Sequence, residues 1–324
     1  FALFDMGSRN GIYAGDKGKK AKISEYLSGF NMHPVFLSRK DTELYYEGYC
    51  NSTIWPLFHY FYTYTRHDPG YWEAYRKVNL LFAEKVKEIA GSRDIIWIHD
   101  YHLMLLPMMI REQLPTVRIG FFLHIPFPSS ELFRTLQNRD ELITGLLGAD
   151  LIGFHTYSYM RHFMSSLYRL KGLESDNNTF HYENRIFSVE TFPMGINFSN
   201  FYKAHKDPEV KDMVQHLREQ YPGRKIVLSV DRLDYSKGLL QRLESFRHLL
   251  SEHPEWIAKV SLIIILVPSR DNVDKYHQLK VGIDETIGNI NGTWSRPGWV
   301  PIHYFYQSFG FKELTAFYFV SDIM

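Results

Sequence analysis

The sequence contains a single cysteine, Cys50, so it cannot form an internal disulfide bond. One cysteine in 324 residues is typical of proteins from a reducing compartment, and we expect a cytoplasmic location. No apolar run approaches the roughly 20 residues that a membrane-spanning helix needs. No secretory signal opens the chain, which begins at Phe1. These absences argue against a secreted or a membrane-spanning protein.

The sequence also lacks an excess of charge of either sign. Lys and Arg number 37 and Asp and Glu number 36, which leaves a net charge of +1. Proteins that bind nucleic acid or acidic membranes usually carry a basic surplus, so we expect neither partner. The two common phosphate-binding motifs, G-x-G-x-x-G and G-x-x-x-x-G-K-[ST], are both missing. Any site for an anion must therefore be a local cluster of another kind.

Six short apolar runs predict fully buried parallel strands, at 94–100, 117–124, 150–156, 225–231, 260–268 and 316–322. Helical periodicity lies between them, over 71–90, from Ser130 to about 147, and over 239–250. Strands that alternate with helices predict an α/β fold with doubly wound layers. Pro193 and Gly195 mark a break in the pattern, and we expect two domains, 1–197 and 198–324.

Polar residues follow the predicted strands. They are His99, Asp100 and His102 after the first, His124, His155, the pair Asp231-Arg232, Arg270, and Ser321-Asp322 after the last. Ligands of doubly wound folds bind outside the carboxyl ends of the strands, so these residues are candidates for a site. A solvated loop explains any one of them equally well.

The stretch SVDRLDYSKGL, residues 229–239, predicts a site for an anion. Arg232 ends a strand, and Lys237 precedes the next helix. A helix N-terminus offers free N–H groups, and two cations beside it suit a diphosphate. The alternative is an ordinary capped helix with two surface cations.

Two further patterns bear on a metal site and on a sugar-binding site. His99, Asp100 and His102 cannot readily converge on a metal, because neighbouring strand residues point to opposite faces, so we predict no metal site. The aromatic run 53–64 is mostly core or domain-edge packing. An exposed Trp55, or Tyr46, would also suit the apolar face of a sugar.

Seven motifs together resemble the trehalose-6-phosphate synthase family. They are YYEGYCNSTIWPLFHY, WIHDYHLMLLP, GFFLHIPFPSSELFRTL, GFHTYSYMRHF, FPMGIN, SVDRLDYSKGL and VPSRDNVDKYHQLK, in order from about residue 33 onward. The resemblance implies a GT-B glycosyltransferase with two Rossmann-like domains facing across a cleft. It implies transfer of glucose from UDP-glucose to glucose 6-phosphate, with retention and without a metal or other cofactor.

The resemblance also implies a role for each matching residue. Residues 1–197 would bind the acceptor, with Tyr46 and Trp55 lining its pocket, Asp100 bonding its hydroxyls and Arg270, from the second domain, holding its phosphate. Residues 198–324 would bind the donor, and Arg232 and Lys237 would hold the UDP diphosphate. His124 would contact the donor glucose. A homo-oligomer or a trehalose synthase complex stays open.

Some features depart from the family pattern. The resemblance implies an N-terminal strand and a segment after the last strand that this sequence does not contain, and a last strand with no helix over it also suggests a truncated chain. Asp271 and Ser158 replace a common glycine and a common aspartate. Two alternatives remain: a non-catalytic or regulatory relative, and another GT-B enzyme such as a sucrose-phosphate or glycogen synthase.

Overall fold

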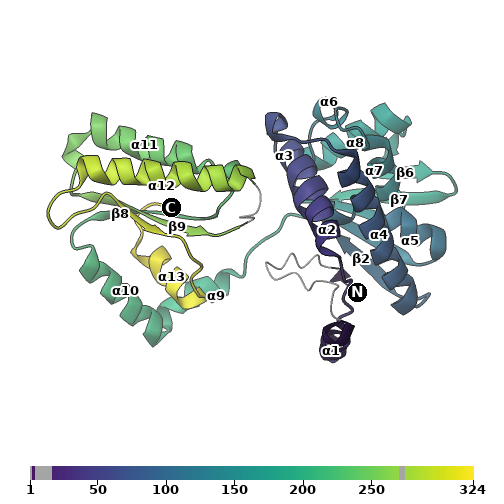
Figure 1. The fold of residues 1–324 in the computed structure, drawn as a ribbon, viewed down its shortest axis with the longest axis horizontal. Coiled ribbons are helices and arrows are strands. Elements are labelled where there is room, and N and C mark those ends of the chain that lie inside the picture. The colour runs from purple at the N-terminus through teal and green to yellow at the C-terminus, as the bar shows by residue number, and fades with distance from the viewer. Residues whose placement is uncertain (1, 4–16, 270–273) are drawn as a thin grey trace. The chain divides into compact units, whose positions relative to one another are not determined.

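The computed structural model describes residues 2–3, 17–269 and 274–324. The chain divides into two compact units, Phe1–Met194 and Gly195–Met324, each built from layered helices and strands (Figure 1). The division falls at Met194, close to the boundary expected at residue 197. The roles assigned to the two domains, for the acceptor and for the donor, remain predictions.

Within the described residues, the first unit is built on a seven-stranded sheet of order β1-β2-β3-β4-β7-β6-β5. The strands are β1 (Ala2–Leu3), β2 (Ile95–His99), β3 (Arg118–Leu123), β4 (Leu151–Phe154), β5 (Ser175–Asp176), β6 (Thr179–Tyr182) and β7 (Arg185–Thr191). The strands β1 to β4 and β7 are parallel, whereas β5 and β6 are antiparallel. The apolar runs at 94–100, 117–124 and 150–156 therefore predict β2, β3 and β4 correctly.

The helices of this unit are α1 (Lys17–Ser28), α2 (Arg39–Asp41), η1 (Thr42–Ile54), α3 (Trp55–Phe58), η2 (Tyr62–Tyr64), α4 (Pro69–Ile89), η3 (Tyr101–Leu103), α5 (Leu106–Gln113), α6 (Ser130–Phe133), α7 (Arg139–Leu146) and α8 (Tyr157–Lys171). The helix predicted over 71–90 is α4. The single helix predicted from Ser130 to about 147 is wrong, because the chain turns tightly between α6 and α7. The N–H groups of Leu136 and Arg139 donate to carbonyl oxygens three residues earlier, which breaks the helix there.

The two faces of this sheet differ in exposure. Alternate side chains such as Ile96, Ile98 and Ile152 are fully buried. Their neighbours on the other face are not, since Trp97 is 52% exposed and Ile186 is 59% exposed. The prediction of fully buried strands is therefore wrong for β2, whose burial alternates along its length. The described helices leave this second face partly open.

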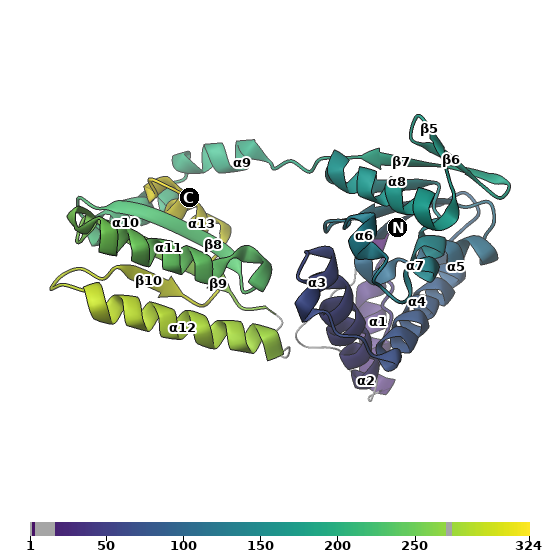
Figure 2. The same cartoon turned by 90° about the horizontal axis from the view of Figure 1, so that it is seen from above.

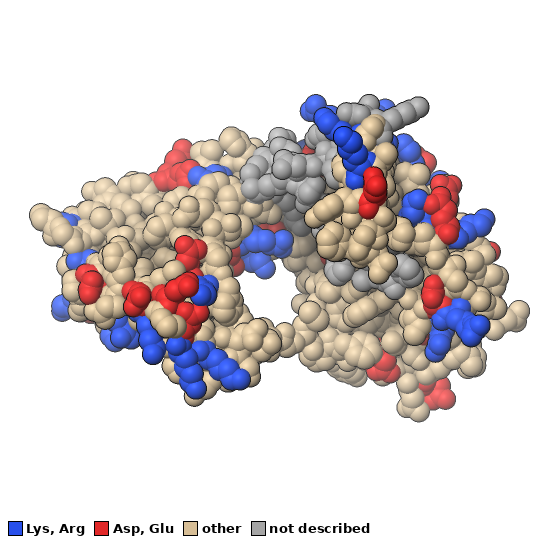
Figure 3. Space-filling model, turned by 90° about the horizontal axis from the view of Figure 1, so that it is seen from below, with Lys and Arg blue, Asp and Glu red and all other residues tan. Residues whose placement is uncertain are grey.

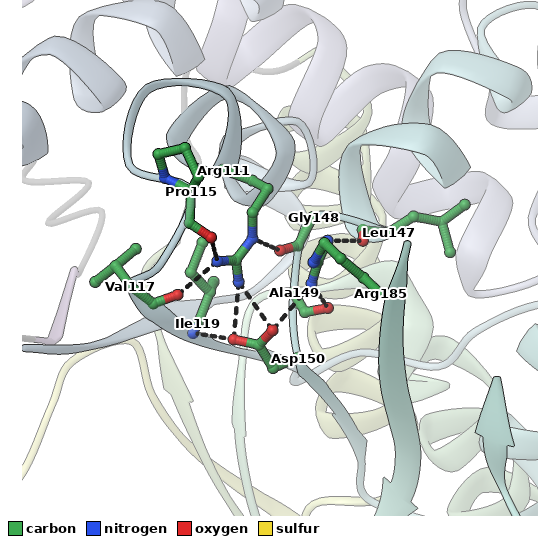
Figure 4. A network of polar contacts seen from close by, with 9 residues as sticks. All are labelled: Arg111, Pro115, Val117, Ile119, Leu147, Gly148, Ala149, Asp150 and Arg185. Atoms are coloured by element: carbon green, nitrogen blue, oxygen red, sulfur yellow. Dashed lines mark hydrogen bonds and ion pairs between the residues drawn. The ribbon is translucent and has the colours of Figure 1, made fainter. Parts of the chain in front are cut away.

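A partly buried ionic network lies at the amino-terminal edge of the sheet (Figure 4). Asp150, directly ahead of β4, accepts two bonds from Arg111 Nη2, at 2.9 and 2.8 Å. It also accepts from Arg185 Nη2 at 3.0 Å and from the Ile119 N–H at 2.7 Å. Because Ile119 belongs to β3, the network fixes β3 and β4 against each other. The positions of their opposite ends depend on that register.

In the described part of the second unit, three parallel strands form a sheet of order β10-β9-β8. The strands are β8 (Lys225–Arg232), β9 (Val260–Val267) and β10 (Ile302–Phe305). The helices are α9 (Phe198–Lys203), η4 (Ala204–Lys206), α10 (Pro208–Gln220), η5 (Tyr235–Lys237), α11 (Leu239–Glu252), η6 (Pro254–Trp256), α12 (Asp274–Trp294) and α13 (Phe311–Val320). Figures 1 and 2 both show α11 beside α12.

Helices cover both faces of this smaller sheet. The predicted stripe Leu239, Leu243, Phe246 and Leu250 is buried between α11, α12 and β9. A second cluster, which includes Phe317 of α13, packs on the opposite face. Figure 1 shows α10 and α13 on that side of the strands. This is the doubly wound layering that the sequence predicts.

The strand predicted at 316–322 is wrong, because these residues lie mostly in α13. The Glu313 carboxylate accepts from the Gly310 N–H at 2.8 Å and starts this helix. Only Ile323 makes a single bridge to β8. A continuous apolar run of this length fits a buried helix as well as a strand. The uncovered last strand that suggested a truncated chain is therefore not present at residues 316–322.

The outer surface carries both charges, in keeping with the small net charge. On the face drawn in Figure 3, Lys and Arg lie interspersed with Asp and Glu. A helix long and apolar enough to cross a membrane does not occur among the described residues. The Gly- and Lys-rich composition of residues 7–22 predicts a loop. The segment is instead helical from Lys17 onward, and its earlier residues lie outside the described ranges.

Candidate active site

Three neighbouring strands of the first unit end in histidines. His99 ends β2, His124 follows β3, and His155 follows β4. Because β3 lies between β2 and β4, their carboxyl ends bring these side chains together. His99 Nδ1 and His124 Nε2 are 2.9 Å apart, and the rings of His124 and His155 are 5.5 Å apart. The first unit therefore carries a polar cluster at the sheet edge where doubly wound folds bind ligands.

The surroundings of the three imidazoles lower their pKa values and so favour the neutral form. Burial lowers the pKa of His124 below its usual range. Burial, and after it the charge of His124, lowers the pKa of His99 and of His155. In the contact between His99 and His124, one neutral ring donates and the other accepts. A neutral His124 has one N–H donor and one acceptor nitrogen to offer a ligand.

Asp100 has a strained backbone beside this cluster. Its φ of 72° and ψ of 170° lie in a region that is essentially reserved for glycine. The Asp100 N–H donates to the Phe122 carbonyl oxygen at 2.7 Å, and Asp100 Oδ1 accepts from the His124 N–H at 3.2 Å. Such strain costs about 1–3 kcal/mol and concentrates at functional sites. The sequence alone predicts the carboxylate here but not the strain that aims it.

Two aromatic residues were predicted to face a sugar. Tyr46 lies in η1 and stacks on His102, with ring centres 5.6 Å apart and an angle of 12° between the planes. His102 Nδ1 lies 3.9 Å from Asp100 Oδ2, so His102 lies between Tyr46 and the Asp100 carboxylate. Trp55 is only 6% exposed and packs on His59, with ring centres 4.1 Å apart. The core of the first unit encloses this ring, so Trp55 does not offer an exposed face to a sugar, and its place in an acceptor pocket stays a prediction.

The helix that carries Tyr46 has an unusual geometry. Between Thr42 and Ile54 the chain forms a π-helix, and the N–H of Trp55 donates to the carbonyl oxygen of Cys50, five residues earlier. Long π-helices are rare, and short π segments are frequent at functional sites. Periodicity analysis does not separate this helix from an α-helix, so the sequence gives no signal for it.

In the second unit, two cations follow β8. Arg232 is its last residue and Lys237 ends η5, and both side chains are exposed. Among the described residues, neither side chain makes a hydrogen bond or an ion pair. Gly238 follows at φ +64°, a left-handed conformation that suits glycine, and no side chain of the described residues caps the first turn of α11. The uncapped N–H groups of α11 and two unpaired cations thus share one end of the sheet.

Two acidic residues support this turn: Asp231, which the sequence indicates only as one candidate at a strand end, and Asp234, which it does not indicate. Asp234 is 1% exposed, and its carboxylate accepts from the Ser236 N–H at 2.9 Å and from the Tyr276 hydroxyl at 3.1 Å. Asp231 pairs with Arg242 of α11 at 2.6 Å. The spacing Asp-x-Ser ahead of a turn is the signal that could have identified Asp234.

Ser321 and Asp322 do not join these groups. Arg270 lies outside the described residues. Asp322 accepts from the Ile226 N–H at 2.9 Å, at the amino end of β8, so Ser321 and Asp322 are at the wrong edge of the sheet. The reason is that the segment before them is a helix and not a strand. In the part of the chain that the structure describes, no three acidic, histidine or cysteine residues gather to hold a metal.

Known proteins match both the sequence and the fold. The model of the family described as Glycosyltransferase family 20 matches residues 6–324. The alpha,alpha-trehalose-phosphate synthase [UDP-forming] of Yarrowia lipolytica is 45% identical over 319 residues, which cover 97% of this chain and 68% of the relative.

Two solved structures are similar as well. One is an alpha,alpha-trehalose-phosphate synthase (UDP-forming) from Burkholderia xenovorans in complex with glucose-6-phosphate. It has a TM-score of 0.84 and 32% identity, over 88% of this chain and 64% of that one. The other is described as trehalose-6-phosphate from E. coli bound with UDP-2-fluoro glucose. It has a TM-score of 0.84 and 34% identity, over 89% of this chain and 64% of that one.

These matches confirm the predicted α/β fold with two Rossmann-like units of the GT-B type, the second with a small sheet. The chain spans about two thirds of the length of these relatives. The chain belongs to glycosyltransferase family 20, the family of the trehalose-6-phosphate synthases.

Proposed function

We propose that the protein transfers glucose from UDP-glucose to glucose 6-phosphate, giving α,α-trehalose 6-phosphate and UDP with retention and without a metal. One observation supports this proposal most. Arg232 and Lys237 stand without a partner among the described residues, at the uncapped start of α11. In a member of family 20, this arrangement suits the diphosphate of a sugar nucleotide.

The proposed chemistry needs these cations. When the bond between the sugar and the diphosphate breaks, positive charge develops on the anomeric carbon and negative charge on the departing phosphate. Fixed cations and helix N–H groups stabilise the departing charge as it forms, and this electrostatic contribution is often the largest in catalysis. Arg232 offers a planar fork and Lys237 a compact charge, so together they can serve where other transferases use a metal.

The first unit would bind the acceptor. The Asp100 carboxylate is positioned by its strained backbone to accept hydrogen bonds from sugar hydroxyls. Tyr46 lies next to it and Trp55 packs behind the same edge. The Burkholderia xenovorans relative was solved in complex with glucose-6-phosphate, which supports this acceptor. The assignment of Arg270 to the acceptor phosphate rests on the resemblance alone, because this residue lies outside the described ranges.

The donor side is supported by a relative too. The E. coli structure carries UDP-2-fluoro glucose, a close analogue of UDP-glucose. We propose that His124, held neutral by burial, contacts the donor glucose through a ring nitrogen. The acceptor hydroxyl oxygen would bond to the anomeric carbon as the bond to the diphosphate breaks. Its proton would pass to the departing phosphate oxygen, on the same face of the sugar, which retains the configuration.

The test is release of UDP from UDP-glucose by the full-length protein, with and without glucose 6-phosphate. We expect UDP release to require glucose 6-phosphate and the product to be α,α-trehalose 6-phosphate by NMR. Mannose 6-phosphate is a matched control that differs at one hydroxyl. Binding of both substrates without UDP release would support the alternative of a non-catalytic relative. Transfer to an acceptor other than glucose 6-phosphate would indicate a different GT-B enzyme.

A further inference from the structure

Asp231 is an acidic residue at a place where the proposed function requires an anion to bind. It lies directly before Arg232 at the end of β8, and its side chain is 19% exposed. An unpaired carboxylate at this position would repel a diphosphate. The carboxylate is instead paired with Arg242, whose Nη1 lies 2.6 Å from Asp231 Oδ2.

Arg242 makes two further contacts from the first turn of α11. Its Nη1 also donates to the Ser229 hydroxyl, and its Nη2 donates to the carbonyl oxygen of Lys237 at 3.3 Å. Ser229 and Asp231 are two residues apart on β8, so their side chains point to the same face of the strand. One planar guanidinium therefore joins the end of the strand, the turn η5 and the start of the helix.

The bond to Lys237 bears on the shape of the turn. Lys237 is followed by Gly238 in the left-handed conformation, and Gly238 is the N-cap residue of α11. Arg242 thus binds the carbonyl oxygen of the same residue, Lys237, whose side chain carries the positive charge. Asp234 holds the beginning of the same turn through the Ser236 N–H. The turn is thus fixed at both ends by side chains that lie behind it.

We infer that Arg242 is a positioning residue of the diphosphate site, which neutralises Asp231 and fixes the main chain at Lys237. The inference rests on the proposed function, since it assumes that a diphosphate binds beside Arg232 and Lys237. Arg242 acts through these residues, and its own cationic group is engaged with Asp231. Loss of Arg242 would leave one negative charge unbalanced near the phosphates and free the turn.

The experiment is calorimetric titration of the full-length protein with UDP and, separately, with uridine. Arg242→Gln can keep a donor for the Lys237 carbonyl oxygen but removes the charge. Arg242→Ala removes both contacts. At surface-like dielectric, one unbalanced charge within several ångströms changes affinity on the order of tenfold. We therefore expect Arg242→Gln to weaken UDP about tenfold, Arg242→Ala to weaken it more, and uridine binding to change little in either.

A second substitution separates charge from general damage. Asp231→Asn added to Arg242→Gln removes the unbalanced carboxylate and is expected to restore most of the UDP affinity. Arg247→Ala is the matched control, because Arg247 lies on the same helix and pairs only with Glu244 among the described residues. It should bind UDP like the wild type. Thermal unfolding of each variant verifies that α11 is still formed.

The outcomes separate this inference from the proposed function. If the wild type binds no UDP, both are wrong. If the wild type binds UDP and Arg242→Gln and Arg242→Ala bind it equally well, the positioning role is wrong and the proposed function stands. Equal losses of UDP and uridine affinity, or no recovery with Asp231→Asn, would also overturn the positioning role.

Discussion

Substitution of Asp150 by alanine tests how the ionic network at the amino-terminal edge of the first sheet holds β3 and β4 together. The Asp150 carboxylate accepts two bonds from Arg111 and one each from Arg185 and the Ile119 N–H. Arg111 is 8% exposed, so Asp150→Ala leaves a buried guanidinium without its counter-ion. Loss of one partner of a buried pair costs about 3–5 kcal/mol. The Asp150 side chain is 38% exposed, and solvent screening reduces the expected cost to about 2–3 kcal/mol.

Hydrogen exchange measures this cost locally, which matters because a two-unit chain need not unfold in one step. Amides of β3 and β4 in Asp150→Ala should exchange about 30- to 140-fold faster than in the wild type. Asp140→Ala is the matched control. Asp140 is half exposed and lies 3.9 Å from Arg139 and from Lys171, so its loss should cost about 0.5 kcal/mol or less. Equal effects of the two substitutions would refute the role assigned to the network in Figure 4.

Three further predictions concern the site itself. The pKa values of His99, His124 and His155 are lowered in the folded protein, so the unfolded chain binds protons more readily. The contribution of these groups to stability should be full above about pH 6.5 and should fall as the pH drops below it. Urea midpoints that do not change with pH would contradict this. Asp100→Gly should be more stable than Asp100→Ala by about 1–2 kcal/mol. Both variants lose the carboxylate, but only glycine relieves the backbone strain, and its greater entropy in the unfolded chain offsets part of that gain. Equal unfolding free energies of the two variants would show that the strain is absent. Gly238→Ala should lower the free energy of unfolding by about 1 kcal/mol, because Gly238 has a left-handed backbone. Gly195 has neither a left-handed backbone nor close neighbours, so Gly195→Ala should change it little in the same thermal unfolding experiment.

The strands that carry the site are predictable, and their helices are less so. β2, β3, β4, β8 and β9 are apolar runs between turn signals, and such runs are the clearest strand signal in a sequence. The same signal failed for residues 316–322, because the second half of α13 is a continuous apolar run, although only part of the helix is buried. The hairpin β5–β6 and the strand β7 were missed, since their short, mixed sequences carry no apolar run.

The candidate site shows a similar division. Polar residues at strand ends follow from topology, so Asp100, His124 and Arg232 are found by reading the chain. The pair His99–His124 depends on which strands are neighbours, and that order is not visible in one sequence. The contacts of Arg242 depend on how far a side chain reaches from a helix to the end of a strand. The strain at Asp100 is a property of the backbone conformation, and the residue type does not indicate it.

The central claim is that Arg232, at the end of β8, and Lys237, which follows it, act on the leaving diphosphate. The most direct measurement is the kcat for UDP release by full-length protein with glucose 6-phosphate, compared among the wild type, Arg232→Ala and Lys237→Ala. Loss of stabilisation for the departing charge predicts a fall of roughly 10²-fold or more in each variant. A kcat close to that of the wild type in either one would contradict the claim that both cations stabilise the leaving group.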